Sequence, residues 1–88
     1  MDVRFRDTAF AEYNEFWRTD RQIAIKIDKL ITEIARTPYE GTGHPERLKY
    51  EMSGYWSRRI SKEHRLVYRV DEENDVVFIS SCMGHYDL

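Results

Sequence analysis

Four arginines lie close together between Ser53 and Val70, and guanidinium groups are well suited to binding phosphate. They are Arg58, Arg59, Arg65 and Arg69. The guanidinium fork of N–H donors matches two phosphate oxygens. From Pro45 to Val70 the chain carries seven basic and three acidic residues, a net charge of +4, whereas the whole chain carries −2. The remainder therefore carries −6, and this segregation predicts a phosphate-binding surface on an otherwise acidic protein.

The other reactive residue types form no pattern of a metal site or a nucleophile. His44, His64 and His85 lie on separate predicted elements without the spacing of metal ligands. The one cysteine, Cys82, lies in an apolar stretch and is expected to be an inert core thiol. The segment 41–43, Gly-Thr-Gly, is too short for a phosphate-binding loop and does not lead into a helix. The sequence therefore indicates no metal and no cofactor.

A β-hairpin is predicted to position the arginines. Its strands are 55–60 and 65–70, which are rich in aromatic and β-branched residues, with a polar connection at 61–64. Side chains alternate between the two faces of a strand. One face is predicted to meet the core and the other to be basic and open: Trp56, Ile60, Leu66, Tyr68 and Val70 on the first; Tyr55, Ser57, Arg59, Arg65, Val67 and Arg69 on the second. Arg58 falls on the apolar face, and we expect it at an edge with its charged head in water.

The N-terminal part predicts a short strand and two helices. Residues 2–6 alternate as a strand does, and Asp7 or Thr8 can cap a helix that runs to about Arg18. Its aromatic stripe is expected to join the core: Phe10, Tyr13, Phe16 and Trp17. Residues 19–22, Thr-Asp-Arg-Gln, match a capping box for a second helix with one isoleucine- and leucine-rich face, and Pro38 ends this helix at Thr37.

The C-terminal half predicts strands around the hairpin. A loop with both prolines covers 38–45, and a strand is expected at 46–51 with Leu48 and Tyr50 toward the core. An acidic turn at 71–75 precedes an apolar strand at 76–82. The predicted order is β-α-α-β-β-β-β, an α+β fold in which a helical hairpin covers one face of a mostly antiparallel sheet.

Length and composition bound the class of protein. The 88 residues favour a single domain over 1–88, and 41% hydrophobic residues suffice for one modest core. No stretch is apolar enough for a signal peptide or a membrane span. With one cysteine and no internal disulfide, a cytoplasmic location is expected.

Several segments together resemble the YoeB family of bacterial toxins, ribosome-dependent mRNA interferases of the RelE superfamily. The resemblance covers nearly the whole chain, and its most specific segments are 37–41 (TPYEG), 45–49 (PERLK), 53–60 (SGYWSRRI), 63–68 (EHRLVY) and the pair His85-Tyr86. It implies a small α+β toxin fold, cleavage of mRNA in the ribosomal A site, a cognate antitoxin, and a homodimer. The tail departs from the family pattern, because Met83-Gly84 precede the histidine and Asp87-Leu88 follow the tyrosine.

The resemblance also implies roles for individual residues. Glu46 matches the general base, Arg65 the arginine that stabilises the scissile phosphate, His85 the general acid, and Tyr86 the aromatic residue beside it. The residues expected to position or neutralise RNA are Lys49, Arg59 and Glu63.

These residue types suit RNA cleavage without a metal. The reaction needs a base for the 2′-OH, a cation for the phosphorane and an acid for the 5′-oxygen. Without the resemblance, Glu46 and the arginines would be read as solvated surface residues, and His85 as an exposed terminal one. The alternative is a non-catalytic module on the same fold that binds RNA, the ribosome or a gyrase-type protein target, since a fold alone does not determine function.

Overall fold

The structure is a computed structural model that describes residues 1–84. Its elements follow the predicted order: β1 (Asp2–Phe5), α1 (Asp7–Thr19), α2 (Arg21–Arg36), β2 (Glu46–Arg47), β3 (Trp56–Arg59), β4 (Arg65–Asp71) and β5 (Val76–Ser81). A 3₁₀ turn, Tyr50–Met52, lies between β2 and β3. The predicted α+β class is confirmed.

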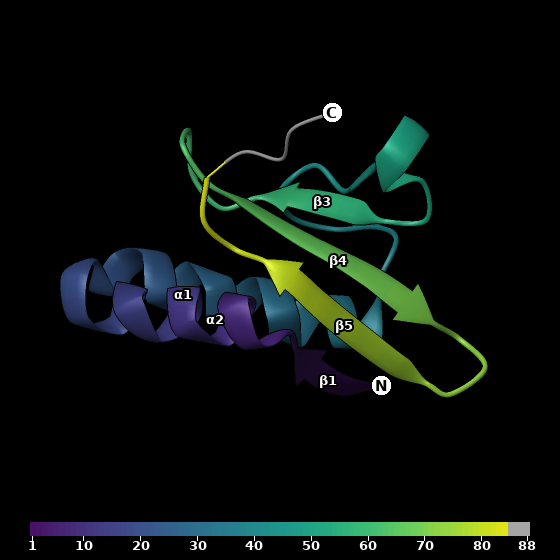
Figure 1. Cartoon of the computed structure of the whole chain (residues 1–88), viewed down its shortest axis with the longest axis horizontal. Coiled ribbons are helices and arrows are strands. Elements are labelled where there is room, and N and C mark those ends of the chain that lie inside the picture. Colours follow the sequence, from purple (N-terminus) through teal and green to yellow (C-terminus); the bar gives the residue numbers. More distant parts are fainter. Residues whose placement is uncertain (85–88) are drawn as a thin grey trace.

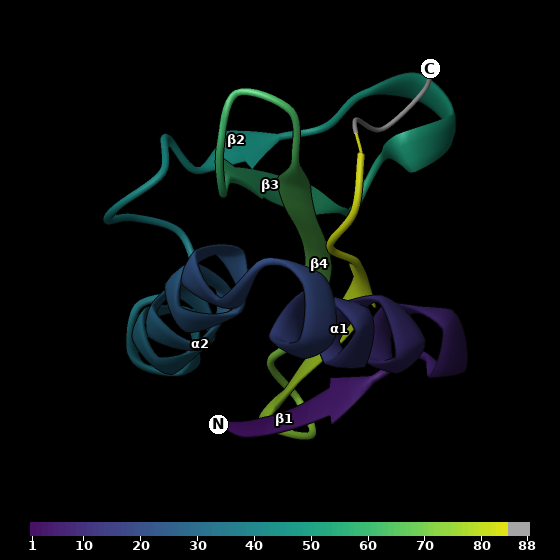
Figure 2. The same cartoon turned by 90° about the vertical axis from the view of Figure 1, so that its left-hand side faces the viewer.

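The strands form one five-stranded sheet in the order β1-β5-β4-β3-β2 (Figure 1). β1 runs parallel to β5, and the remaining pairs are antiparallel. The helices lie side by side against one face of this sheet (Figure 2). Neither α1 nor α2 covers the other face of the sheet.

The core lies between the helices and the inner face of the sheet. Leu66, Tyr68 and Ile79 come from the strands, and the apolar face of α2 packs on them with Ile27 and Ile34. Phe16 of α1 is buried as predicted, but Phe10 is 50% exposed. Phe10 contacts the rings of Phe5 and Tyr13, and these contacts leave half of its surface exposed.

Two predicted helix caps are wrong. Thr19 ends α1, and its hydroxyl donates to the Glu15 carbonyl oxygen; the cap of α2 is Asp20, whose carboxylate accepts from the Ile23 amide. At the start of α1 the capping position is held by Arg6 in extended conformation, without a side-chain cap. The helices therefore follow each other with a single residue between them, which forces the tight helical hairpin.

The predicted strand 46–51 is also wrong beyond its first two residues. Leu48 is buried, as expected, but Tyr50 is 81% exposed. Tyr50 adopts a left-handed backbone conformation with φ of 58°, which interrupts the extended chain. The Met52 amide then donates to the Lys49 carbonyl oxygen at 3.1 Å and closes the 3₁₀ turn.

Arg58 differs most from its prediction. The side chain is fully buried, head included, where an edge position with a solvated head was expected. It forms an ion pair with Glu33 of α2. Burial of a guanidinium is tolerated because its N–H groups find acceptors inside the protein.

Candidate active site

Strand register places three of the predicted site residues on the face that the helices leave uncovered. Glu46 lies opposite Ser57, and Arg59 lies opposite Arg65. Ser57 and Arg59 are two positions apart on β3, so their side chains share a face. Glu46, Arg59 and Arg65 therefore project from the same side of three adjacent strands.

Two residues of this face are buried, although the alternation predicted an open surface. Ser57 and Val67 are only 3% and 2% exposed. Both are short side chains whose neighbours on the same face are long: Tyr55, Arg59, Arg65 and Arg69. The face therefore combines buried short side chains with longer basic and aromatic ones.

Arg65 is half-buried, and the hairpin connection orients it. Its Nη1 donates to the carbonyl oxygens of Ser61 at 2.8 Å and His64 at 3.1 Å. Both bonds involve the same terminal nitrogen. A guanidinium held in this way keeps its direction before any phosphate arrives, which is the preorganisation that charge stabilisation requires.

The chain that leads to His85 is fixed next to Arg65. Gly84, the last described residue, accepts a 2.9 Å hydrogen bond at its carbonyl oxygen from the Arg65 amide. The Gly84 amide in turn donates to His64 Nδ1 at 2.9 Å. The predicted site residues His85 and Tyr86 follow immediately in the sequence and lie outside the described residues.

His64 makes structural contacts with Phe16 and with Gly84. Its ring packs edge-on against Phe16, with ring centroids 5.0 Å apart. Because Nδ1 accepts from Gly84, the neutral ring must carry its proton on Nε2. His64 therefore links the core to the end of the described chain. Residue type and position in the sequence gave no signal for this contact.

Glu46 lies at the end of a loop that approaches β3 closely. The Arg59 amide donates to the Gly43 carbonyl oxygen at 2.7 Å. Gly43 has φ of 87°, and a Cβ there would lie 2.9 Å from the Arg59 carbonyl oxygen, so only glycine fits. An open groove of about 480 Å³ runs beside Glu46, lined by Gly41, Gly43, His44, Pro45 and Glu46.

The three predicted RNA-positioning residues are exposed, and they come from separate elements. Arg59 ends β3 on the shared face, Lys49 precedes the 3₁₀ turn, and Glu63 lies in the hairpin connection, where its amide donates to Ser61 Oγ. Register places only Arg59 beside Arg65. Lys49 lies beside the start of β3, and Glu63 lies in the connection that follows its end, so the strand separates these two residues.

The basic surface extends further across the sheet than the hairpin alone predicts. A second open hollow of about 560 Å³ is lined by three arginines and three aromatic residues, among others: Arg4, Arg6, Arg69, Phe5, Tyr55 and Phe78. Arg69 lies over the Phe78 ring at 4.1 Å from its centroid, a cation–π contact. Arg4 and Arg6 thus add positive charge to this face. Its other arginines, Arg59, Arg65 and Arg69, lie more than fifty positions later in the chain.

Other chemistry finds little support in residues 1–84. No three His, Cys, Asp or Glu side chains of this part cluster as metal ligands would. Cys82 is fully buried, and this desolvation raises the pKa of its thiol to about 12. A thiol with such a pKa stays protonated and inert, as predicted. No helix among the described residues could span a bilayer.

Comparison with solved structures defines the class of protein as that of the small RelE- and YoeB-type toxins. A YoeB/ParE toxin from Agrobacterium tumefaciens has a TM-score of 0.94 and 42% identity, covering 98% of this chain and 100% of the other. Two Staphylococcus aureus structures, a heterotetrameric YoeB-YefM complex and a YoeB dimer, have TM-scores of 0.87 and 0.88 at 42% identity, covering 98% of both chains.

Sequence comparison gives the family. The chain is 44% identical to Toxin YoeB of Escherichia coli K12 over 86 residues, which cover 98% of this chain and 100% of that one. The model of the YoeB-like toxins of bacterial type II toxin–antitoxin systems matches residues 5–86. The chain belongs to this family, so the resemblance seen in the sequence is confirmed.

Proposed function

We propose that this toxin is an endoribonuclease that cleaves mRNA in the ribosomal A site by acid–base chemistry without a metal. The observation that carries the proposal is the shared face of Glu46, Arg59 and Arg65, with Gly84 bonded to Arg65. The ribosome as the site of action rests on family membership. A toxin acting there would work in the cytoplasm and inhibit translation.

The proposed reaction is an in-line attack within the RNA. Glu46 takes the proton of the 2′-OH, and the 2′-oxygen attacks the adjacent phosphorus. Arg65 stabilises the charge that develops on the phosphorane oxygens. As the bond from phosphorus to the 5′-oxygen breaks, His85 donates a proton to the leaving oxygen. The products are a 2′,3′-cyclic phosphate and a 5′-hydroxyl.

The remaining site residues are proposed to hold the RNA. Tyr86 would stack on a base next to the scissile linkage, because aromatic rings bind unstacked bases in this way. Lys49 and Arg59 would neutralise neighbouring phosphates, and Glu63 would help to orient the arginines. These four side chains affect binding and alignment rather than proton transfer.

We further propose that an acidic segment of a cognate antitoxin covers Arg59 and Arg65 and that the toxin forms a homodimer. The basic face supplies charge complementarity for such a segment, which would be disordered before it binds. The Staphylococcus aureus relatives are described as a YoeB-YefM heterotetramer and a YoeB dimer. A segment bound to this face would both block access to the site and neutralise its positive charge.

Mapping of RNA ends tests the proposal directly. Purified protein added to translating ribosomes should yield new mRNA 5′ ends by primer extension. Those ends should accept phosphate from polynucleotide kinase without prior phosphatase treatment, because they carry a 5′-hydroxyl. The His85→Gln variant should remain folded and yield no new ends. Ribosome binding without any cleavage by the unaltered protein would favour a non-catalytic binding module instead.

A further inference from the structure

The buried Arg58 joins β3 to the loop that precedes Glu46. Its five N–H groups make five hydrogen bonds: to the Tyr68 hydroxyl, the Glu33 carboxylate, and the carbonyl oxygens of Thr42, Thr37 and Glu40. The bonds to Thr37 and Glu40 are both 2.8 Å long. Every donor of the guanidinium therefore has a partner, and three of the acceptors belong to the loop backbone.

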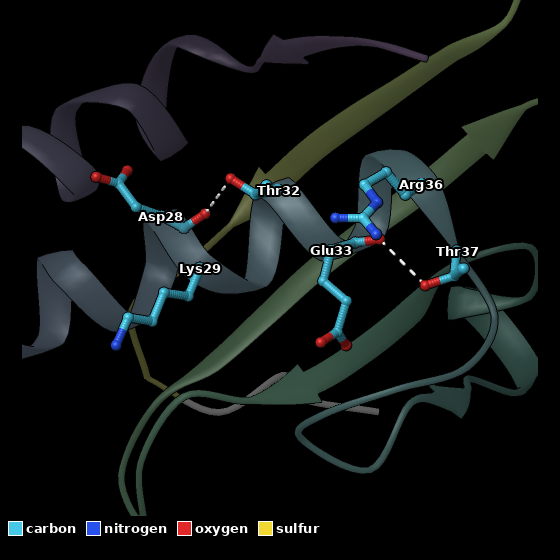
Figure 3. Close-up of a pocket in the computed structure, with 6 residues that line it drawn as sticks. All are labelled: Asp28, Lys29, Thr32, Glu33, Arg36 and Thr37. Atoms are coloured by element: carbon cyan, nitrogen blue, oxygen red, sulfur yellow. Dashed lines mark hydrogen bonds between the residues drawn. The ribbon is translucent and has the colours of Figure 1, made fainter.

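Tyr68 and Glu33 bind the same loop as Arg58. The Tyr68 hydroxyl donates to the Pro38 carbonyl oxygen at 2.7 Å. The Glu33 carboxylate accepts from the Thr42 amide at 2.6 Å and from its hydroxyl at 3.0 Å. Figure 3 shows the Glu33 carboxylate extending from α2 on a different side from Asp28 and Thr32. We call Arg58, Glu33 and Tyr68 the loop anchor.

The loop also passes so close to Glu33 and to β3 that a side chain larger than that of glycine would clash at Gly41 and Gly43. At Gly41, with φ of 126°, a Cβ would lie 2.0 Å from Glu33 Oε1. Gly43 is fixed by its bond from the Arg59 amide. Between Gly43 and Glu46 only two residues remain, His44 in a left-handed conformation with φ of 53°, and Pro45, whose own φ is restricted by its ring.

If stability alone mattered, apolar side chains at the positions of Arg58 and Glu33 would avoid the free-energy cost of burying charged groups. A buried ion pair recovers little more than its own desolvation cost, and hydrophobic replacements of similar size are often as stable. What an apolar side chain cannot do is bind several backbone carbonyls and so set the path of a loop. The loop anchor is therefore better suited to fixing geometry than to adding stability.

We propose that the loop anchor is a positioning device for Glu46, with Arg58 and Glu33 as positioning residues that hold the candidate base toward the face of Arg59 and Arg65. The proposal rests on the nuclease function proposed above and assigns no contact between these residues and RNA. It predicts that weakening the anchor lowers the rate of the chemical step while leaving ribosome binding intact.

Two variants test the anchor, with a third as a matched control. Glu33→Gln keeps the side-chain length and an oxygen for Thr42 but removes the charge that pairs with Arg58. Arg58→Lys keeps a charge but cannot reach the separate carbonyls with one ammonium group. The control is Ile27→Val, a fully buried position of α2 whose apolar side chain takes no part in the hydrogen bonds of the loop anchor.

Two measurements separate positioning from general stability. Amide hydrogen exchange of residues 41–47 should be faster in both anchor variants and unchanged in the control. Single-turnover cleavage on saturating ribosomes should fall about tenfold or more, because small displacements of a reacting group are costly, while the ribosome concentration for half-maximal rate stays the same. The control should cleave as the unaltered protein does.

Other results would overturn the proposal. Unchanged exchange and unchanged single-turnover rates in both anchor variants would remove any positioning role. An equal loss of rate in Ile27→Val would mean that the anchor contributes only stability. If the unaltered protein cleaves no RNA, the proposed nuclease function is wrong, and the anchor then has no role in catalysis. The exchange data would then still report whether the anchor fixes the loop.

Discussion

The amide of Arg65 donates a 2.9 Å hydrogen bond to the carbonyl oxygen of Gly84, which lies 19 positions further along the chain. This bond joins the start of β4, where the candidate phosphate-binding side chain lies, to the segment that continues into His85. His64, the residue before Arg65, binds the Gly84 amide through Nδ1. His64 and Arg65 thus bind both backbone polar groups of Gly84, its amide and its carbonyl oxygen.

Replacing His64 should impair cleavage through this contact. In His64→Leu the Gly84 amide loses its acceptor, a loss of about 1 kcal/mol, and single-turnover cleavage should fall about tenfold because the following segment is less well placed. His64→Asn is the matched variant, since its Oδ1 can accept in place of Nδ1, and it should keep most of the activity. Equal rates in both variants would contradict a role for the hydrogen bond.

Removing the guanidinium of Arg65 should have a larger effect. We expect Arg65→Ala to lower the single-turnover rate by about 10² to 10³, the range for loss of one oxyanion-stabilising group. Thermal unfolding should change little because the side chain is only half-buried. Arg18→Ala, which removes an exposed arginine on α1, serves as the control for charge alone and should cleave normally.

Arg58 should be the most sensitive position for stability. The Arg58→Met variant leaves the Tyr68 hydroxyl and the loop carbonyls without their buried donor. We expect the free energy of unfolding in urea to fall by about 3 kcal/mol, a typical cost of breaking a buried charged network. A loss no greater than that of Ile27→Val would mean that water replaces the lost donor.

The loop anchor should also make stability depend on pH. Hydrogen bonds from Thr42, and then from Arg58, lower the pKa of the Glu33 carboxyl below its ordinary value of 4.5. A carboxyl whose pKa is lowered by folding stabilises the protein above the unfolded-state pKa, and this contribution disappears as pH falls through the folded-state pKa. Urea unfolding between pH 7 and pH 3 should show the loss in the unaltered protein.

The same titration in Glu33→Gln isolates this carboxyl. The difference in free energy of unfolding between the two proteins should shrink as the pH drops below 4.5. Asp71, whose pKa is lowered mainly by the Asn74 side chain, remains in both proteins and cancels in the difference. A difference that is constant with pH would show that the charge of Glu33 does not contribute.

Tyr50 offers a test of backbone strain near the site. A tyrosine at φ of 58° has an unfavourable conformation, and its 81% exposure means that little packing offsets it. Tyr50→Gly should therefore raise the free energy of unfolding by about 0.5 to 1 kcal/mol, after the entropic cost of glycine. The same change at Tyr55, which directly precedes β3 and is not among the residues with positive φ, should destabilise the protein.

Local patterns were sufficient to predict most of the fold. The helical period of the isoleucines and leucines in 23–34 fixed the buried face of α2, and alternation in 65–70 placed Leu66 and Tyr68 in the core. The same alternation put Arg59 and Arg65 on one open face, and register confirms that they share it. The role of Glu46 came from resemblance, since an exposed carboxylate at a strand start has no distinctive local pattern.

Predictions failed where a distant partner decides the outcome. Arg58 was expected at an edge because Glu33, the carboxylate that pairs with it, lies 25 positions away on another element. Tyr50 fitted the alternation of a strand, but a left-handed backbone conformation does not follow from residue type for tyrosine. The contact of His64 with Gly84 likewise spans 20 positions. Such pairs are visible only once the chain has folded.

The position of β5 in the sheet has a consequence for how the toxin is made. β5 lies between β1 and β4, yet of the five strands described in residues 1–84 it is the last to be synthesised. A nascent polypeptide that stops short of Val76 has nothing to join its first strand to the hairpin. The five-stranded sheet can therefore form only after β5 (Val76–Ser81) has been translated, and β1 waits without its partner strand until then.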